Sequence, residues 1–133
     1  MIQQIAVFLE NKAGKASGCC KVLKDANINL LALSIADTKD FGILRIITCD
    51  NEKALKILRE AGYLANMVDL VGIDVPNRSG ALSELLILLG ESGINVEYMY
   101  SYAESDGRAK IALKTTEAEK AMEVLKNAGV KII

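Results

Sequence analysis

Pro76-Asn77-Arg78-Ser79-Gly80-Ala81-Leu82 is the stretch that decides the fold. It follows residues 69–75, in which Val71, Ile73 and Val75 occupy alternate positions, as is typical of a half-buried strand. It precedes a segment whose leucines recur with the spacing of one helix face, Leu82, Leu85, Leu86 and Leu89. The stretch is therefore predicted to be the turn between a strand and a helix.

The chain carries this pattern twice, because residues 1–66 align with residues 67–133. The first copy has a looser turn, Asn11-Lys12-Ala13-Gly14. Each turn is followed at the same separation by a similar segment, Ile28-Asn29-Leu30 or Ile94-Asn95-Val96. We predict one βαββαβ unit per copy, with domain ranges 1–66 and 67–133.

Hydrophobic periodicity places the remaining elements of each copy. We expect second strands at 30–36 and 96–103, third strands at 43–49 and 109–115, second helices at 52–61 and 117–128, and short last strands at 63–67 and 130–133. A turn at 38–41 joins the second and third strands of the first copy. Two helices that bury their apolar stripes on one face of a four-stranded antiparallel sheet form the ferredoxin-like arrangement. The predicted fold class is α+β, with two ferredoxin-like βαββαβ repeats, antiparallel sheets and helices on one face.

The second strand of the first copy has apolar residues at both parities along residues 30–36. A sheet that is covered on one face only should alternate, so we expect the other face of this sheet to be covered as well. A repeat of this length buries only about 60% of the surface that its unfolded chain exposes. We therefore expect each copy to pack on the other or on a second chain, which favours a homodimer.

The composition excludes several classes of protein. Hydrophobic residues make up 51% and charged residues 25%, which is typical of a globular domain. The net charge of -1, without a basic cluster, argues against nucleic acid binding. No apolar run reaches the roughly 18 residues that cross a bilayer, and the N-terminus lacks a signal-peptide pattern, so we expect a cytoplasmic protein.

The chain has no histidine, and its three cysteines form no CxxC motif. We therefore expect no metal, no cofactor and no catalytic residue. Asp37, Asp40, Glu104 and Asp106 fall in expected hairpin turns, where acidic residues are common for structural reasons. An enzyme is the hypothesis with the least support from the residues.

Both polar turns have the chemistry to bind a free α-amino acid. A helix N-terminus presents backbone N–H groups and a partial positive charge, which suit a carboxylate. Gly14 and Gly80 allow the backbone to approach a ligand closely, and asparagine amide oxygens can accept hydrogen bonds from an ammonium. The alternative is that Asn, Ser and Gly serve here as ordinary turn and capping residues.

These residues resemble the ACT domain, a small regulatory module of amino-acid metabolism. The two turns are similar to its Asn/Asp-Arg-Pro-Gly-x-Leu turn, and Ala26-Asn27-Ile28-Asn29-Leu30 and Ser92-Gly93-Ile94-Asn95-Val96 are similar to its Gly-Ile/Val-Asn-Ile segment. The resemblance covers the whole chain in two copies. It is greatest to the stand-alone tandem ACT proteins of prokaryotes, which have no catalytic domain.

The resemblance implies that an amino acid binds at interfaces between paired ACT units. The implied ligand-binding residues belong to the two turns and to the starts of the two second strands: Asn11, Lys12, Ala13, Gly14, Asn29, Leu30, Asn77, Arg78, Ser79, Gly80, Ala81, Leu82, Asn95 and Val96. Both turns depart from the family pattern, since Ala13 and Ser79 replace the proline before the glycine. The first copy also has Lys15-Ala16 in place of Ala81-Leu82, so we expect its pocket to be altered or empty.

Two functional hypotheses follow. The leading one is a non-enzymatic regulatory or sensor protein that binds a free amino acid, forms a homodimer and is read by a partner enzyme or regulator. The alternative is an interaction or assembly module with vestigial pockets that acts as the regulatory subunit of a partner enzyme. The alternative predicts a dimer whose melting temperature ignores amino acids.

Overall fold

The structure is a computed structural model that describes residues 1–37 and 40–133, so residues 38 and 39 of the expected turn at 38–41 lie outside the described residues. The chain divides into two compact units. The N-terminal unit is Gln3–Val68, and the C-terminal unit is Met1–Ile2 with Asp69–Ile133. Ile2 packs on Gly72 of the C-terminal unit, where a Cβ would meet the Ile2 side chain at 2.9 Å, so this position favours glycine.

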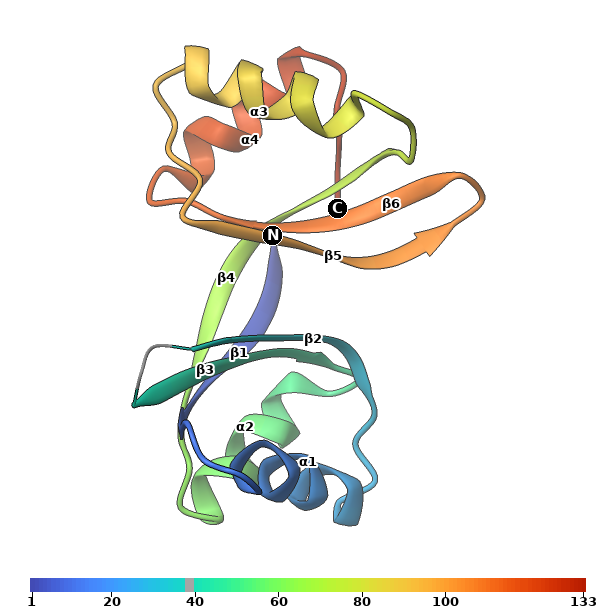
Figure 1. Cartoon of the computed structure of the whole chain (residues 1–133). Helices are drawn as coiled ribbons and strands as arrows, with labels where there is room; N and C mark the ends of the chain where they lie inside the picture. The colour runs from blue at the N-terminus through green and yellow to red at the C-terminus, as the bar shows by residue number, and fades with distance from the viewer. Residues whose placement is uncertain (38–39) are drawn as a thin grey trace. The chain divides into compact units, whose positions relative to one another are not determined.

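The N-terminal unit has the predicted βαββαβ order. Its elements are β1 (Ile2–Glu10), α1 (Lys15–Asp25), β2 (Leu30–Asp37), β3 (Phe41–Thr48), α2 (Asn51–Glu60) and the first part of β4 (Leu64–Pro76). The strands lie in the order β2-β3-β1-β4, and β3 is antiparallel to both β1 and β2. Both helices cover the same face of the sheet (Figure 1).

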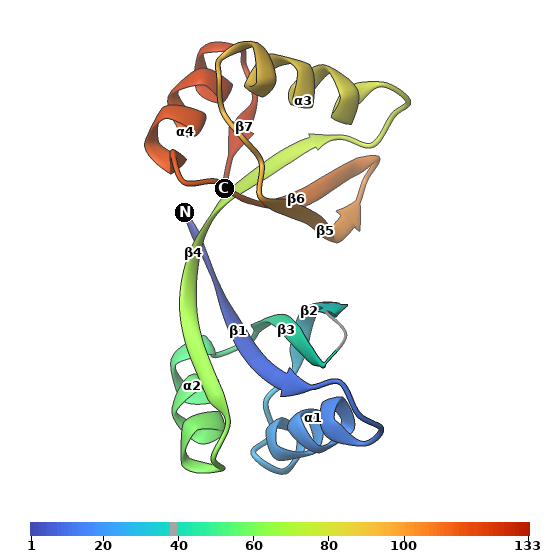
Figure 2. The ribbon, with the colours of Figure 1, turned by 60° about the vertical axis from the view of Figure 1, so that its left-hand side comes forward.

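The C-terminal unit repeats this order. Its elements are the rest of β4, α3 (Ala81–Glu91), β5 (Tyr98–Ser105), β6 (Arg108–Lys114), α4 (Ala118–Asn127) and β7 (Lys131–Ile132). The strand order is β5-β6-β4-β7, and the printed pairs are antiparallel. Figures 1 and 2 show α3 and α4 on one face. The predicted fold class is confirmed.

One strand, β4, serves both units. The sequence predicted two separate strands here, at 63–67 and 69–75, but β4 runs without a break over 13 residues, Leu64–Pro76. The chain between Met67 and Leu70 contains no glycine or proline, so nothing in its chemistry ends the strand there.

Each unit has its own apolar core between helices and sheet. In the C-terminal unit the buried face of α3 is Ala81, Leu85 and Leu89, whereas Leu82 is 42% exposed and Leu86 is 37% exposed. The buried face of α3 thus shares Leu85 and Leu89 with the predicted face but includes Ala81 in place of Leu82 and Leu86. An α-helix that is apolar almost all round has no polar face to set its rotation, so packing against the sheet decides which leucines are buried.

The second face of the N-terminal sheet was expected to be covered. Leu31, Leu33 and Ile35 of β2 are instead each more than half exposed. Large exposed apolar side chains on an edge strand are a typical feature of surfaces that contact another protein.

Candidate functional site

The two polar turns share one backbone geometry. Gly14 and Gly80 are the N-cap residues of α1 and α3, with φ of 85° and 87° in the left-handed region that favours glycine. Neither helix has a side-chain cap, whereas the N-cap Asp50 of α2 accepts a hydrogen bond from the Lys53 N–H. The N–H groups of Lys15 and Ala81, the first residues of α1 and α3, donate to the carbonyls of Lys12 and Arg78 at 3.3 Å, so it is the next N–H groups of each first turn that are available to a ligand or to solvent.

The side chains of the C-terminal turn are held by neighbours. Asn77 Nδ2 donates to Glu104 Oε1 at 2.7 Å, and the Asn77 backbone N–H donates to the Gly107 carbonyl at 2.8 Å. Arg78 forms an ion pair with Glu84 at 2.9 Å, and its hydrogen bond lowers the pKa of the Glu84 carboxyl. The turn is thus tied both to the β5–β6 hairpin and to the first turn of α3.

A cavity of about 350 Å³ lies beside the C-terminal turn. Its lining residues come from β4, the turn, α3, β6 and the segment that enters β7: Asp74, Val75, Pro76, Arg78, Ala81, Glu84, Leu85, Leu88, Arg108, Ala128, Gly129, Val130 and Lys131. The cavity borders the end of β4 because β7 pairs only with Ile73 and Asp74. Pro76 has no N–H with which to extend this ladder.

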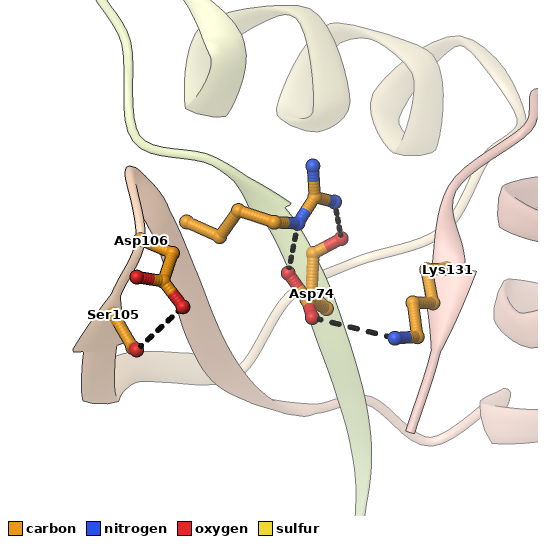
Figure 3. Close-up of polar contacts among 5 residues, drawn as sticks. Asp74, Ser105, Asp106 and Lys131 are labelled. Carbon is orange, nitrogen blue, oxygen red and sulfur yellow. Dashed lines mark hydrogen bonds and ion pairs between the residues drawn. The ribbon is translucent and has the colours of Figure 1, made fainter.

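Three of the residues that line the cavity, Asp74, Arg108 and Lys131, form a charged cluster. Asp74 is 9% exposed; its Oδ1 accepts from Arg108 Nε at 2.7 Å, and its Oδ2 lies 3.8 Å from Lys131 Nζ (Figure 3). Arg108 Nη2 also donates to the Asp74 backbone carbonyl at 3.1 Å. The hydrogen bond from Arg108 lowers the pKa of Asp74, so the carboxylate is ionised at neutral pH.

Ser105 and Asp106 lie on the β5–β6 side of this cluster, where the Ser105 hydroxyl donates to Asp106 at 3.4 Å (Figure 3). Together with Asp74 and Arg108 they line a second cavity of about 260 Å³. Asp74 and Arg108 therefore stand between two cavities of the same unit.

Sequence reasoning missed the charged cluster. Its members come from β4, β6 and β7, and no motif along the chain links them. The one available signal was Asp74, a charged residue inside the otherwise apolar segment from Leu70 to Val75.

The structure does not bring each turn together with its downstream asparagine. Asn95 and Val96 follow the C-terminal end of α3, which has 11 residues, so they lie roughly 16 Å from the turn at its N-terminus. Asn29 and Leu30 line a cavity of about 360 Å³ at the end of α1. Asn11 and Lys12 line a different one, of about 140 Å³.

The other predicted residues sit at the surface of the turns. Ala13, Gly14, Ser79 and Gly80 are exposed, and Ala81 is buried at the start of α3. Lys12 forms an ion pair with Glu10 at 3.0 Å, as Arg78 does with Glu84. The two turns thus agree in backbone but differ in the cavities that they border.

In the described part of the chain, His, Cys, Asp and Glu side chains form no group of three that could hold a metal ion. Among residues 1–37 and 40–133, no helix has the length and apolar character to cross a membrane.

Comparisons with known proteins agree with this architecture. A family model described as an ACT domain pair matches residues 1–133. The crystal structure of protein BT0572 from Bacteroides thetaiotaomicron is 42% identical, with a TM-score of 0.90 over 98% of this chain and 90% of that chain. No curated protein matches the chain.

Two more distant structures share the fold. The regulatory subunit of aspartate kinase from Thermus thermophilus, in its ligand-free form, is 16% identical, with a TM-score of 0.67 over 95% of this chain and 91% of that chain. The aspartokinase alpha and beta subunits are 21% identical, with a TM-score of 0.64 over 96% of this chain and 91% of that chain. With the family model matching from end to end, the chain belongs to the ACT domain pair family.

Proposed function

We propose that this protein is a non-enzymatic regulatory protein that binds a free amino acid in the cavity beside the C-terminal turn. The observation that carries this function is the lining of that cavity. Val75, Leu85, Leu88 and Val130 supply apolar surface, and the acidic residues Asp74 and Glu84 and the basic residues Arg78, Arg108 and Lys131 line the same cavity. A small pocket with apolar surface and a few convergent charges suits an amphipathic zwitterion.

The ligand carboxylate faces the N-terminus of α3, where the first-turn N–H groups and Arg78 carry positive charge. The ammonium faces Glu84 and the carbonyl groups at the C-terminal end of α4, near Ala128. The ligand side chain then lies along Val75 and Leu85. In this pose Arg78 and Ala81 are the residues of the turn that line the site, whereas Asn77, Ser79, Gly80 and Leu82 are not among its lining residues.

Asn95 and Val96 contribute from a second ACT unit. They lie too far from the turn of their own unit to share one small ligand, because α3 separates them by roughly 16 Å. A homodimer can supply the missing asparagine by placing the second-strand start of one ACT unit against the turn of another.

Ligand binding regulates a partner enzyme in this scheme. Proteins of the same fold include regulatory subunits of aspartate kinase, which supports a regulatory role without an active site. A ligand shifts an assembly only by its different affinities for two arrangements. The ligand must therefore bind one dimer arrangement better than another.

Isothermal titration of the purified chain with each common L-amino acid, after removal of carried-over ligand by unfolding and refolding, tests this function. We expect at least one amino acid to bind. Arg78→Met should weaken that binding about tenfold, the usual scale for a lost hydrogen bond to a charged group. The matched Lys12→Met change in the N-terminal turn should leave binding unchanged. If none of the amino acids gives a binding signal, the proposal is overturned.

The alternative function, an assembly module, is favoured by a different observation. Leu31, Leu33 and Ile35 are each more than half exposed on β2. Under this alternative the protein forms a tight dimer or docks on a partner enzyme, and neither its size nor its melting temperature responds to amino acids. Light scattering and thermal melting with and without amino acids separate the two functions.

A further inference from the structure

The charged cluster of Asp74, Arg108 and Lys131 is not required by the fold. Each member has a counterpart in the N-terminal unit, which forms the same βαββαβ unit without charges there. Residues 1–66 align with 67–133, and strand pairing agrees: Pro76 lies opposite Arg108, as Glu10 lies opposite Phe41. The three counterparts of Asp74, Arg108 and Lys131 are Phe8, Phe41 and Leu64.

The counterparts in the N-terminal unit are apolar and exposed, so the fold requires neither a buried side chain nor a charge at these positions. Phe8 is 44% exposed, Phe41 58% and Leu64 66%. The Asp74 side chain is 11% exposed and takes part in two ion pairs. Removing its carboxylate from water on folding costs free energy. The N-terminal repeat lacks this cluster and has the same fold. A role in binding a ligand therefore explains the cluster better than a role in folding does.

The charge balance of the cluster favours an anion. Two cations, Arg108 and Lys131, face the single carboxylate of Asp74. Asp74 is satisfied mainly by Arg108, at 2.7 Å. Lys131 Nζ is 3.8 Å from Asp74 Oδ2, beyond hydrogen-bond distance. The Lys131 side chain is 71% exposed, so its ammonium retains donors for a further acceptor.

The position of the cluster relates this anion to the proposed ligand. The cavity that Arg78, Glu84 and Val75 line is also lined by all three residues of the charged cluster. An amino acid whose head binds beside Arg78 therefore shares its cavity with Lys131 and Arg108. A side chain that ends in a second carboxylate matches the excess positive charge there.

We propose that the ligand is a dicarboxylic amino acid, whose side-chain carboxylate binds Lys131 and Arg108 in this cavity, with Asp74 orienting Arg108. This ligand class rests on the proposed function, because it assumes that the amino-acid head binds beside the turn. It goes further by assigning specificity to three residues outside the turn.

The test compares acids with their neutral isosteres by isothermal titration of the full chain. L-glutamate is compared with L-glutamine, and L-aspartate with L-asparagine. We expect one acid to bind about tenfold more tightly than its amide. Lys131→Met should reduce that ratio about threefold while binding of the amide persists, because Arg108 still contacts the side-chain carboxylate. Lys56→Met, which removes an exposed lysine from α2 in the other unit, has the same change in net charge and should leave the ratio unchanged.

The outcomes separate the ligand class from the function. If an amide or another neutral amino acid binds as tightly as either acid, the dicarboxylic ligand is wrong and the proposed function stands. If no amino acid binds, the proposed function fails, and the ligand class fails with it. A ratio that falls equally in Lys131→Met and Lys56→Met would reflect overall charge and would also overturn the assignment.

Discussion

The groove between the first helix and the last strand is open in the C-terminal unit and filled in the N-terminal unit. In the C-terminal unit it is a cavity of about 350 Å³ lined by Val130 and Glu84. In the N-terminal unit the counterparts are Tyr63 and Gly18. The Tyr63 hydroxyl lies 3.3 Å from the position that a Cβ on Gly18 would take. Two residue differences thus decide whether a copy of this fold carries a groove.

Tyr63 is part of the N-terminal core rather than a surface side chain. It is half-buried and packs against the apolar cluster of its unit. Burial raises the pKa of its hydroxyl, and the neighbouring thiols of Cys19 and Cys20 raise it further. The N-terminal unit therefore holds a protein side chain where we propose that the C-terminal unit holds a ligand.

The largest effect should come from filling the open groove. Val130→Tyr gives the C-terminal unit the residue of the N-terminal one, and the amino acid that binds the wild type most tightly must then displace the new ring. We expect its affinity to fall about a hundredfold, since displacing packed atoms costs on the order of 3 kcal/mol. Isothermal titration measures the change, and thermal melting checks that the variant folds.

Val130→Ala is the matched control for this variant, because it keeps the groove open and removes only two methyl groups. Its affinity for the same amino acid should stay within about fivefold of wild type. A folded Val130→Tyr protein that binds this amino acid like wild type would show that the groove is not the site.

A smaller effect is expected on the free energy of unfolding when the helix glycine of each unit is replaced by alanine. A Cβ on Gly90 in α3 meets nothing within 4 Å, whereas one on Gly18 in α1 meets the Tyr63 hydroxyl at 3.3 Å. Gly90→Ala should raise the free energy of unfolding by about 0.5–1 kcal/mol through helix propensity. Gly18→Ala should raise it by less, because the tyrosine must move. Urea denaturation measures both.

A double-mutant cycle sharpens this comparison. In a Tyr63→Phe background the hydroxyl is absent, so Gly18→Ala should recover the gain seen at Gly90. Equal gains at both glycines in the wild-type background would mean that the Tyr63 hydroxyl does not restrict the groove.

The fold was predictable because its signals are local and duplicated. Alternating residues such as Val71, Ile73 and Val75 marked the strands, and the repeat confirmed each element a second time. The prediction was wrong where no local signal exists. No local sequence pattern shows that Leu64 to Pro76 form one continuous strand. None shows which leucines of α3 face the sheet.

The site was harder to predict because equal spacing along the chain does not mean proximity in space. Asn95 follows Asn77 as Asn29 follows Asn11, yet a whole helix separates the members of each pair. Asp74 and Lys131, by contrast, are far apart in sequence and form an ion pair through the β4–β7 ladder. Whether a groove is open depends on side-chain volume at Tyr63 and Val130, which only packing reveals.

Alkaline pH should produce the smallest effect and should separate the filled groove from the open one. Burial holds the pKa of Tyr63 above its ordinary value of 10.0. The unfolded chain therefore loses this proton before the folded chain does. The stability that Tyr63 contributes is fully present below pH 10.0 and is lost as the pH rises through the folded pKa.

Tyr63→Phe isolates this effect, because phenylalanine has no proton to lose. Burial also raises the pKa of the Cys19 thiol, from 9.0 to about 11, but that contribution is common to both proteins and cancels in their difference. The difference in free energy of unfolding between wild type and Tyr63→Phe should be constant below pH 10.0 and should move in favour of the variant above it. If the difference does not change with pH, the hydroxyl is solvated, and the N-terminal groove is open like its C-terminal counterpart.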